Sequence, residues 1–490
     1  MAAYRRYTKK TVVEEKPKRL LRDWSIYQQD IFKDIACGEG NTHVEAKAGS
    51  GKTSSICEGF YHLPNGWSAL MCAFAKPIQV ELEKRAAGLP ITVLTLHSLG
   101  FRVLRKAYPR LGQPDAYKLQ GYIEAEMGDE LESLDTRDQM AKAISLAKGY
   151  LASKPEEIDE IMDRHDVDPG RETRADFIAK SLKIMAATGR DTMRVDFDDM
   201  IWMPHLHGLK LPQYDYVFVD EAQDLNKAQI DMALNSVTAN GRILTVGDTN
   251  QAIYGFRGAD SAAIQNIVTK LNSKVLPLSI TYRCARAIVE LARTVVPELE
   301  ASPTAEDGLV SSCDDTKMLQ DVRPGDFILS RTNAPLMGYC LNLLKAGVRA
   351  NIQGKDMGKN FLYMIKRSEA NSVNGFLDWL DNWCATEVAR LTAKNRDSSF
   401  ITDKRDCLLA ICEGTNDLNQ VKNNIKALFH EDKESNDRVI LSTTHKAKGL
   451  ERDRVFMLAN TYKKGKSVEE SNLYYVAVTR AKKELYMVAA

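Results

Sequence analysis

Short apolar runs alternate along the chain with longer stretches in which apolar residues recur every three or four positions. A run such as YVFV contains consecutive β-branched and aromatic residues, which is typical of a strand buried on both faces. Strands that alternate with helices predict a parallel sheet in an α/β protein. In the earlier part of the chain, the predicted strands after the first glycine-rich turn are 67–74, 91–95, 215–219, 242–246 and 275–278.

A second group of apolar runs predicts a second parallel sheet in the later part of the chain. These runs are 326–330, 348–352, 438–442, 455–458 and 484–488. Each group is interrupted by charged sequence with helical periodicity, in which no strand is expected. We therefore expect two sheet domains, each with a helical insertion.

Composition places the chain among globular proteins of several domains. Its 490 residues are enough for several cores of roughly 100 to 200 residues each. Hydrophobic residues make up 44% and charged residues 27%, and no apolar run approaches the roughly 18 residues that span a bilayer. The net charge is only +1, so nucleic-acid binding has to come from local groups.

The nine cysteines contain no C-x-x-C pair, which argues against a disulfide framework and against a zinc site. His205 and His207 have no Cys or carboxylate at metal-site spacing, so a metal site there is disfavoured. The first 22 residues are basic rather than apolar, and a solvated arm is favoured over a phosphate-binding one. We expect no membrane association and an intracellular protein, cytoplasmic if it is bacterial or phage-encoded.

The sequence THVEAKAGSGKT runs from a β-like segment through a glycine-containing turn into a helix. Backbone N–H groups around Gly49 and Gly51 can surround an anion, Lys52 can reach the outer phosphates, and the Thr53 hydroxyl can bind Mg²⁺. The pattern G-x-x-x-x-G-K-[ST] has glycine where this chain has Ala46, so the match is one residue short. A chance glycine turn is the alternative at this point.

The run YVFV ends in the sequence DEAQD. Adjacent carboxylates at a strand end suit a metal-dependent phosphoryl enzyme. Asp220 can hold Mg²⁺ through its water shell, and Glu221 can orient and deprotonate an attacking water. A solvated acidic turn is the alternative for a lone Asp-Glu pair, but the glycine turn upstream makes nucleotide hydrolysis the favoured interpretation.

The segment GDTNQAIYGFRGA combines a polar sensor candidate, Gln251, with Tyr254, Phe256 and Arg257. Aromatic rings beside a cation can stack on unpaired bases of any sequence. Core packing is the alternative for the two aromatics, but the flanking glycines favour an exposed loop. The segment therefore indicates contact with single-stranded nucleic acid next to the nucleotide.

Together these three segments resemble superfamily 1A DNA helicases of the UvrD, Rep and PcrA group. Six more segments are similar to further family motifs, in the family's order and across nearly the whole chain. The form AFAK leans toward the branch that contains F-box DNA helicases and phage relatives. These six segments are WSIYQ, CAFAK, TLHS, LSITYR, TTHKAKGLE and LYYVAVTRA.

The resemblance implies a role for each matching residue, with ATP and Mg²⁺ as cofactors. The implied catalytic residues are Lys52, Asp220, Glu221, Gln251, Arg283 and Arg480. The implied nucleotide contacts are Gln28 and Tyr282 at adenine, Glu451 near the ribose, and Ala48, Gly49, Ser50, Gly51, Lys52 and Thr53 at the phosphates. Mg²⁺ would be held by Thr53 and Asp220. The implied DNA contacts are Phe74, His97, Tyr254, Phe256, Arg257, Thr443 and His445.

The resemblance also implies two RecA-like motor domains with a helical insertion in each. Arg283 and Arg480 lie far in sequence from Lys52, so we expect two domains that close on one ATP and stabilise the transferring phosphoryl group. The expected parts are a basic arm (1–22), domain 1A (23–100 and 196–277), insertion 1B (101–195), domain 2A (278–360 and 438–490) and a short insertion in place of 2B (361–437).

The function implied is that of an ATP-dependent DNA helicase or translocase that moves 3′ to 5′ on single-stranded DNA and at junctions with duplex. RNA stays open as a substrate, and either insertion could bind protein partners. The alternative is a DNA-dependent ATPase that strips or remodels protein–DNA complexes without robust unwinding, which the short second insertion keeps open. A scaffold without turnover is disfavoured because the catalytic set is complete.

Overall fold

A computed structural model describes the chain at residues 23–127, 134–165, 167–170, 172–253, 263–393, 398–429 and 437–489. These residues divide into two compact units. With the same gaps, unit 1 comprises the described residues within 23–46, 51–247 and 263–278, and unit 2 those within 47–50, 248–253 and 279–489. Two short segments, 47–50 and 248–253, therefore belong to unit 2 although the chain on both sides of each belongs to unit 1.

Unit 1 is built on a six-stranded parallel sheet in the order β3-β2-β4-β5-β1-β6. Met71 and Phe218 belong to the core on one face, whereas Leu70 and Val217 belong to the core on the other. Both faces are covered, which explains why the strand runs are apolar throughout. The strands are β1 (Thr42–Ala46), β2 (Ala69–Ala73), β3 (Ile91–Thr95), β4 (Tyr214–Val219), β5 (Val237–Gly247) and β6 (Lys274–Leu278).

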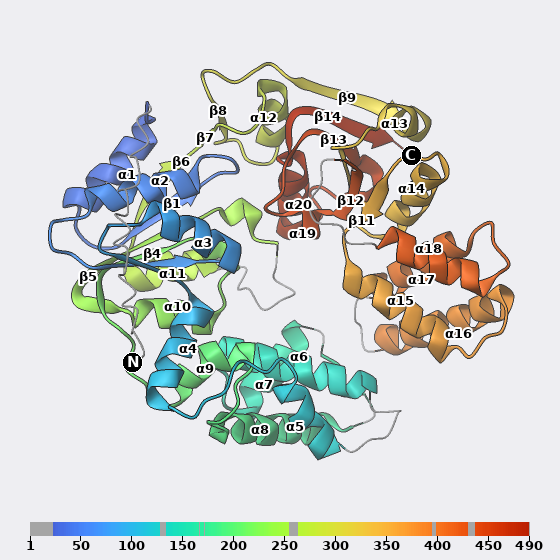
Figure 1. The fold of residues 1–490 in the computed structure, drawn as a ribbon, viewed down its shortest axis with the longest axis horizontal. Coiled ribbons are helices and arrows are strands. Elements are labelled where there is room, and N and C mark those ends of the chain that lie inside the picture. The colour runs from blue at the N-terminus through green and yellow to red at the C-terminus, as the bar shows by residue number, and fades with distance from the viewer. Residues whose placement is uncertain are drawn as a thin grey trace, which may run out of the picture. The chain divides into compact units, whose positions relative to one another are not determined.

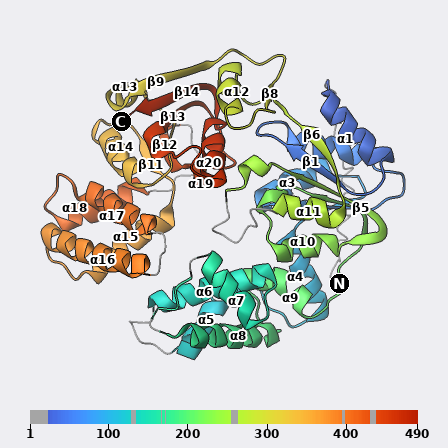
Figure 2. The same cartoon turned by 180° about the vertical axis from the view of Figure 1, so that it is seen from behind.

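The helices of unit 1 fall into two groups, one around the sheet and one formed by α5 to α8, which gather together in both Figure 1 and Figure 2. The second group has a hydrophobic core of its own. The helices are α1 (Ile26–Cys37), α2 (Lys52–Gly59), α3 (Lys76–Arg85), α4 (Leu96–Ala107), α5 (Lys118–Met127), α6 (Leu134–Tyr150), α7 (Pro155–Arg164), α8 (Arg174–Arg190), α9 (Phe197–Leu206), α10 (Lys227–Leu234) and α11 (Ala263–Leu271), with 3₁₀ turns η1 (Phe60–His62) and η3 (Ala222–Asp224).

Helices α4 and α9 connect the two groups of unit 1. In α4, Leu99 belongs to a sheet core and Leu104 to the core of the helical group. The two helices cross so closely at Gly100 that a Cβ atom there would lie 1.8 Å from the carbonyl oxygen of Met200. Because α4 and α9 pack with both groups, the predicted boundaries between domain 1A and insertion 1B at residues 100 and 196 stay predictions.

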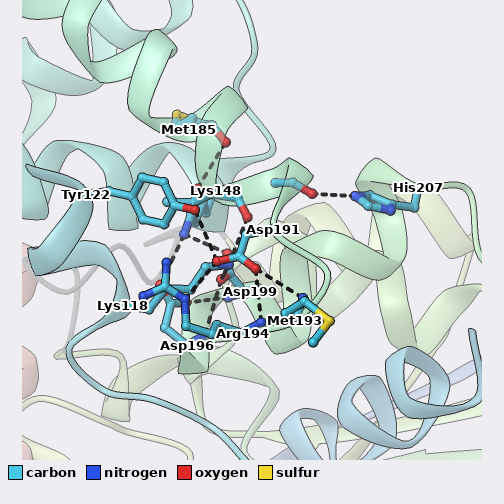
Figure 3. A network of polar contacts seen from close by, with 12 residues as sticks. Lys118, Tyr122, Lys148, Met185, Asp191, Met193, Arg194, Asp196, Asp199 and His207 are labelled. Carbon is cyan, nitrogen blue, oxygen red and sulfur yellow. Dashed lines mark hydrogen bonds and ion pairs between the residues drawn. The ribbon is translucent and has the colours of Figure 1, made fainter. Parts of the chain in front are cut away.

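A buried polar network holds α9 against the helical group (Figure 3). The Asp199 carboxylate accepts from Lys118 Nζ at 2.7 Å and from Lys148 Nζ at 2.8 Å, and all three side chains are fully buried. Asp196, the N-cap of α9, lies 3.4 Å from Lys148 Nζ. Paired and hydrogen-bonded charges of this kind fix geometry, since loss of one partner leaves a buried charge.

Unit 2 contains a second six-stranded parallel sheet, in the order β11-β12-β10-β13-β14-β9. The α/β fold with two parallel sheets is therefore confirmed. The five expected runs coincide with β10 to β14, whereas edge strand β9 was not expected. The strands are β9 (Leu309–Asp314), β10 (Phe327–Ser330), β11 (Ala350–Ile352), β12 (Val439–Thr443), β13 (Arg452–Leu458) and β14 (Ala481–Ala489), with a separate parallel pair β7 (Ile280–Thr281) and β8 (Glu300–Ala301).

The helical insertion of unit 2, α15 to α18, shares one hydrophobic core with its sheet. Phe361 and Leu408 of the insertion belong to the same buried cluster as Leu441 of β12. None of the described helices in either unit combines the length and apolarity that would span a membrane. The helices of unit 2 are α12 (Arg286–Arg293), α13 (Asp315–Asp321), α14 (Ala334–Lys345), α15 (Lys355–Arg367), α16 (Val373–Ala393), α17 (Ser399–Cys412), α18 (Leu418–Leu428), α19 (Thr444–Ala447) and α20 (Val468–Val478), with 3₁₀ turns η4 (Thr249–Gln251) and η6 (Ala459–Thr461).

The crossing of α4 and α9 gives a test of the packing in unit 1. We expect Gly100→Ala to lower the free energy of unfolding by about 3 kcal/mol, because the added methyl group forces two helix backbones apart. Gly121→Ala in α5 is the control: a Cβ atom there meets nothing within 4 Å, so we expect a gain of about 0.5 kcal/mol. Urea denaturation followed by circular dichroism measures both, and equal stability of the two variants would contradict the close crossing.

Candidate functional site

The turn between β1 and α2 has the backbone that its glycines predict. Gly49 and Gly51 have φ angles of 71° and 81°, a region that residues with a Cβ atom rarely adopt. Ala46 stands where the phosphate-loop pattern has glycine, but it is the last residue of β1, pairs with Leu278 and is fully buried. It lies outside the set of described residues with positive φ, so alanine fits this position without strain.

The same turn offers polar groups to an anion. The hydroxyl oxygen of Ser50 is buried and has no hydrogen-bond partner within the described part of the chain. Gly51, the N-cap of the eight-residue helix α2, provides no side-chain hydrogen bond to the helix start. A helix N-terminus with unsatisfied donors favours bound negative charge. Thr53 lies in the first turn of α2, the part of a helix at which an anion is favoured.

In unit 1, the structure brings Lys52 and Glu221 together. Lys52 Nζ lies 3.1 Å from Glu221 Oε2, and both side chains are largely buried. Gln223 Nε2 donates to the same carboxylate oxygen at 2.5 Å. The phosphate-loop lysine and the acidic pair after β4 therefore meet although 169 residues separate them.

Asp220 lies in a strongly desolvated position at the end of β4. Burial and the adjacent Glu221 carboxylate raise the pKa of Asp220 to about 7, and Lys52 offsets part of this effect. Glu221 has a φ of 50°, an uncommon conformation for a residue with a side chain. Strained backbone beside a carboxylate with a perturbed pKa is typical of a functional position.

Gln28 lies at the base of the phosphate loop. Its Oε1 accepts from the Ser25 backbone N–H at 3.0 Å and so caps α1, while its Nε2 donates to Ser55 Oγ at 2.9 Å. The Ser55 hydroxyl donates in turn to the Gly51 carbonyl at 3.0 Å. The predicted adenine contact of Gln28 stays a prediction, but these bonds fix the side chain beside the loop.

Gln251 lies in the short turn η4, which packs within unit 2. Gln251 Nε2 donates to Asp248 Oδ2 at 2.6 Å. The Tyr475 hydroxyl lies 3.4 Å from the same carboxylate oxygen and accepts from the Ala48 backbone N–H at 2.9 Å. The predicted sensor and the tip of the phosphate loop are therefore held by one buried tyrosine of α20.

Two arginines of unit 2 lie close together. Arg283 forms an ion pair with Glu451, whose other oxygen lies 3.2 Å from Lys482 Nζ. Burial raises the pKa of Glu451, but Arg283 and Lys482 outweigh this effect and leave it below its ordinary value. Burial and the nearby Arg283 lower the pKa of Arg480 to about 10. Two neighbouring guanidinium groups favour a bound anion.

The phosphate loop also touches the segment that carries Tyr282 and Arg283. The Tyr282 backbone N–H donates to the Gly49 carbonyl at 2.9 Å. A Cβ atom on Gly49 would lie 2.5 Å from Arg283 Cβ and from Thr281 Oγ1. Gly49 is therefore required by close approach as well as by its φ angle. The Tyr282 ring is half exposed, as an adenine-stacking role requires.

Phe74 and His97, the predicted strand contacts of unit 1, follow two adjacent strands. Ala73 and Thr95 pair at the ends of β2 and β3, so the two side chains start from the same edge of the sheet. Phe74 is 44% exposed, which is unusual for a phenylalanine. Burial lowers the pKa of His97, so its ring is neutral at pH 7.

The other predicted strand contacts lie in unit 2 or outside the described residues. Thr443 ends β12 and is buried, and His445 lies in α19, which begins immediately after it. Tyr254, Phe256 and Arg257 lie outside the described residues.

Three residues at the site were not singled out from the sequence: Asp248, Asn472 and Tyr475. Asn472 Nδ2 donates to the carbonyl oxygens of Thr249 and Ala252. All three lie inside or next to the segments GDTNQ and LYYVAVTRA. The signal was therefore present, but an aromatic residue in an apolar helix is ordinarily assigned to the core.

Among the described residues, no three His, Cys, Asp or Glu side chains gather as a metal site. The predicted Mg²⁺ ligands fit a different arrangement, in which the phosphates of a nucleotide complete the coordination. The raised pKa of Asp220 supports this fit, because a carboxylate buried beside a second carboxylate is stabilised by a cation.

Comparison with known proteins gives two matching family profiles. UvrD/REP helicase N-terminal domain matches residues 27–272, and UvrD-like helicase C-terminal domain matches residues 367–490. Among curated relatives, ATP-dependent DNA helicase PcrA of Bacillus subtilis is 26% identical over 57% of this chain and 40% of its own length.

Two other relatives match most of the chain. A probable DNA helicase of Mycoplasma pneumoniae is 24% identical over 93% of this chain and 82% of its own length. F-box DNA helicase 1 of Gallus gallus is 24% identical over 91% of this chain and 47% of its own length. The alignments thus cover less than half of PcrA and of the chicken protein. Because the first profile alone spans half of the chain, the chain belongs to the UvrD/Rep helicase family.

Proposed function

We propose that the protein hydrolyses ATP with Mg²⁺ and uses the hydrolysis to move 3′ to 5′ along single-stranded DNA and to unwind duplex at junctions. The observation that carries this proposal is the meeting of Lys52 with Glu221, next to the buried Asp220. The names of the relatives support DNA as the substrate. The polarity rests on resemblance to the 1A branch.

Bound ATP supplies the phosphoanhydride bond, and Mg²⁺ neutralises charge on its phosphates. Lys52 binds the outer phosphates and shares its charge with Glu221, while Thr53 and Asp220 hold the metal. Glu221 orients the attacking water and accepts its proton. Gln223 donates to Glu221 Oε2 at 2.5 Å, which supports a fixed direction for the carboxylate.

Arg283 and Arg480 are the proposed partners of the transferring phosphoryl group. Their proximity, which lowers the pKa of Arg480, supports this role because a phosphate relieves the repulsion of the two cations. Glu451 now pairs with Arg283 and would share it with the ribose and phosphates of a nucleotide. Tyr282 and Gln28 are the proposed adenine contacts.

The proposed strand contacts are Phe74 and His97 in unit 1 and Thr443 and His445 in unit 2. The exposed ring of Phe74 supports base stacking. A neutral His97 supports hydrogen bonding or stacking rather than charge attraction. Such contacts tolerate any base sequence, as movement along a strand requires.

We expect Lys52→Ala to abolish ATP hydrolysis stimulated by single-stranded DNA, with a loss of at least 100-fold in kcat, because no other group of the loop replaces the lysine at the phosphates. Steady-state phosphate release with and without single-stranded DNA measures the effect. Lys33→Ala, on the exposed face of α1, is the control and should retain wild-type turnover. Unimpaired hydrolysis in Lys52→Ala would overturn the site.

Duplexes with a single-stranded 3′ or 5′ tail test movement and polarity together. We expect ATP-dependent strand separation with the 3′ tail only. ATP hydrolysis without strand separation on either tail would favour the DNA-dependent ATPase that strips proteins from DNA. A preference for the 5′ tail would contradict the proposed polarity, and matched RNA tails decide whether DNA is required.

The raised pKa of Asp220 links the metal site to stability. The ordinary value of 3.8 applies to the unfolded chain, whereas the folded protein keeps the proton up to about pH 7. Between these values the folded state binds one more proton than the unfolded state, so the contribution of Asp220 to stability falls as pH rises. Above pH 7 the buried charge is fully present unless a cation neutralises it.

We therefore expect Asp220→Asn to raise the melting temperature in the absence of nucleotide by a few degrees Celsius at pH 8, and by less at pH 5. Asp215→Asn in the same strand is the control. Hydrogen bonds from the Ser68 backbone N–H and hydroxyl lower the pKa of Asp215, so its loss should not raise the melting temperature. Differential scanning fluorimetry at both pH values measures the change. An equal effect of Asp220→Asn at pH 5 and pH 8 would contradict the raised pKa.

A further inference from the structure

The phosphate loop contains a second lysine whose position the pattern G-x-x-x-x-G-K-[ST] leaves open. Lys47 follows β1 directly, and its side chain is 5% exposed. Its Nζ donates to the side-chain oxygen of Asn250 at 2.8 Å. Glu298, whose side chain is 62% exposed, lies 4.0 Å from Nζ. The lysine is therefore directed to the turn that carries Gln251.

Asn250 and Gln251 are coupled through one buried carboxylate. The Asn250 backbone N–H donates to Asp248 Oδ1 at 3.0 Å, and Gln251 Nε2 donates to Asp248 Oδ2 at 2.6 Å. Asp248 is fully buried, so its orientation determines where both neighbours lie. A group that holds Asn250 therefore also fixes the direction of the Gln251 side chain.

The segment that carries the proposed strand contact His445 also binds this turn. Lys448 Nζ donates to the Gln251 carbonyl oxygen at 2.7 Å, and Lys448 directly follows α19. All of these residues belong to unit 2. The turn thus lies between Lys47 of the phosphate loop and Lys448 of the segment proposed to contact DNA.

We propose that Lys47 is a positioning residue, which holds the Gln251 turn so that the phosphate loop and the Thr443–Lys448 segment act on each other through it. This inference rests on the proposed ATP-driven activity and deepens it. Lys47 does not need to touch ATP. It acts on turnover through Asn250, Asp248 and Gln251, so its loss should change kcat and leave nucleotide binding intact.

The test compares Lys47→Met, Asn250→Ala and the double variant in ATP hydrolysis with saturating single-stranded DNA. We expect each variant to lose about tenfold in kcat, with KM for ATP unchanged within about twofold. The loss of kcat in the double variant should be no larger than in either single variant, because all three variants lack the same hydrogen bond between Lys47 and Asn250. Lys47→Arg keeps a donor and should recover most of the rate.

Controls separate this contact from general damage. Lys142→Met removes a half-buried lysine, which donates to the His165 carbonyl at 2.6 Å in the helical insertion, and should leave kcat unchanged. Asn250 is itself only half-buried, so Asn250→Ala is expected to fold. Unchanged kcat in Lys47→Met, a raised KM with normal kcat, or multiplying losses in the double variant would each overturn the proposal.

A second readout does not depend on activity. Hydrogen exchange of the amides of residues 248–253 should be faster in Lys47→Met than in the wild type without nucleotide, and unchanged exchange would overturn the positioning role. If the proposed function is wrong, the result is different: the wild-type protein itself shows no ATP hydrolysis stimulated by single-stranded DNA. In that case the exchange experiment still decides whether Lys47 holds the turn.

Discussion

Two adjacent carboxylates at the end of a strand whose last four residues are buried set the main electrostatic constraint of this molecule. Asp220 and Glu221 repel each other where water is excluded, and the pKa of Asp220 rises to about 7 as a result. Lys52 offsets part of the repulsion through its contact with Glu221. A second cation is favoured beside Asp220, so the metal requirement that we propose follows from the same burial that shapes the strand.

The parallel sheet of unit 1 brings the phosphate loop and the acidic residue Asp220 to the same edge. The carboxyl ends of parallel strands lie at one edge of a sheet, and β1, β2, β3 and β4 are followed there by the phosphate loop, Phe74, His97 and Asp220. Each of these positions is the first or second residue after its strand, or a turn that follows it directly. In unit 1 the proposed chemistry and the proposed strand contacts therefore lie at the same edge of the sheet.

Much of this arrangement could be predicted from the sequence, because local rules govern it. Apolar runs and the residues that end them predict the phosphate loop, the acidic pair and ten of the twelve strands in the two large sheets. The β-like start of the phosphate-loop segment also indicates β1. The sequence does not predict strand β9, because half of LVSSCD is polar and the strand lies half exposed at a sheet edge.

Contacts between distant segments could not be predicted in the same way. Tyr475 holds the Ala48 amide across 427 residues, and no pattern in either segment specifies that pair. Lys47 likewise occupies a position that the motif leaves free. The family resemblance indicated which segments belong to the site, but tertiary packing decides which side chain within a segment makes the contact.

The two helical insertions are attached in physically different ways, and this difference bears on how each can influence the site. The first has its own core and joins the sheet part of unit 1 at the crossing of α4 and α9 at Gly100 and where α6 packs on α10. The second has a small cluster of its own at Cys384, Leu391 and Ile401, but most of its core is shared with the sheet. Val439 and Leu441 of β12 pack with its helices, whereas the intervening Ile440 packs in the cluster that contains Tyr475. Because β12 ends at Thr443, a change in the packing of the second insertion displaces the strand that positions Thr443 and His445. The first insertion reaches His97 through α4, because His97 lies in the first turn of this helix and Leu104 of the same helix belongs to the core of the insertion.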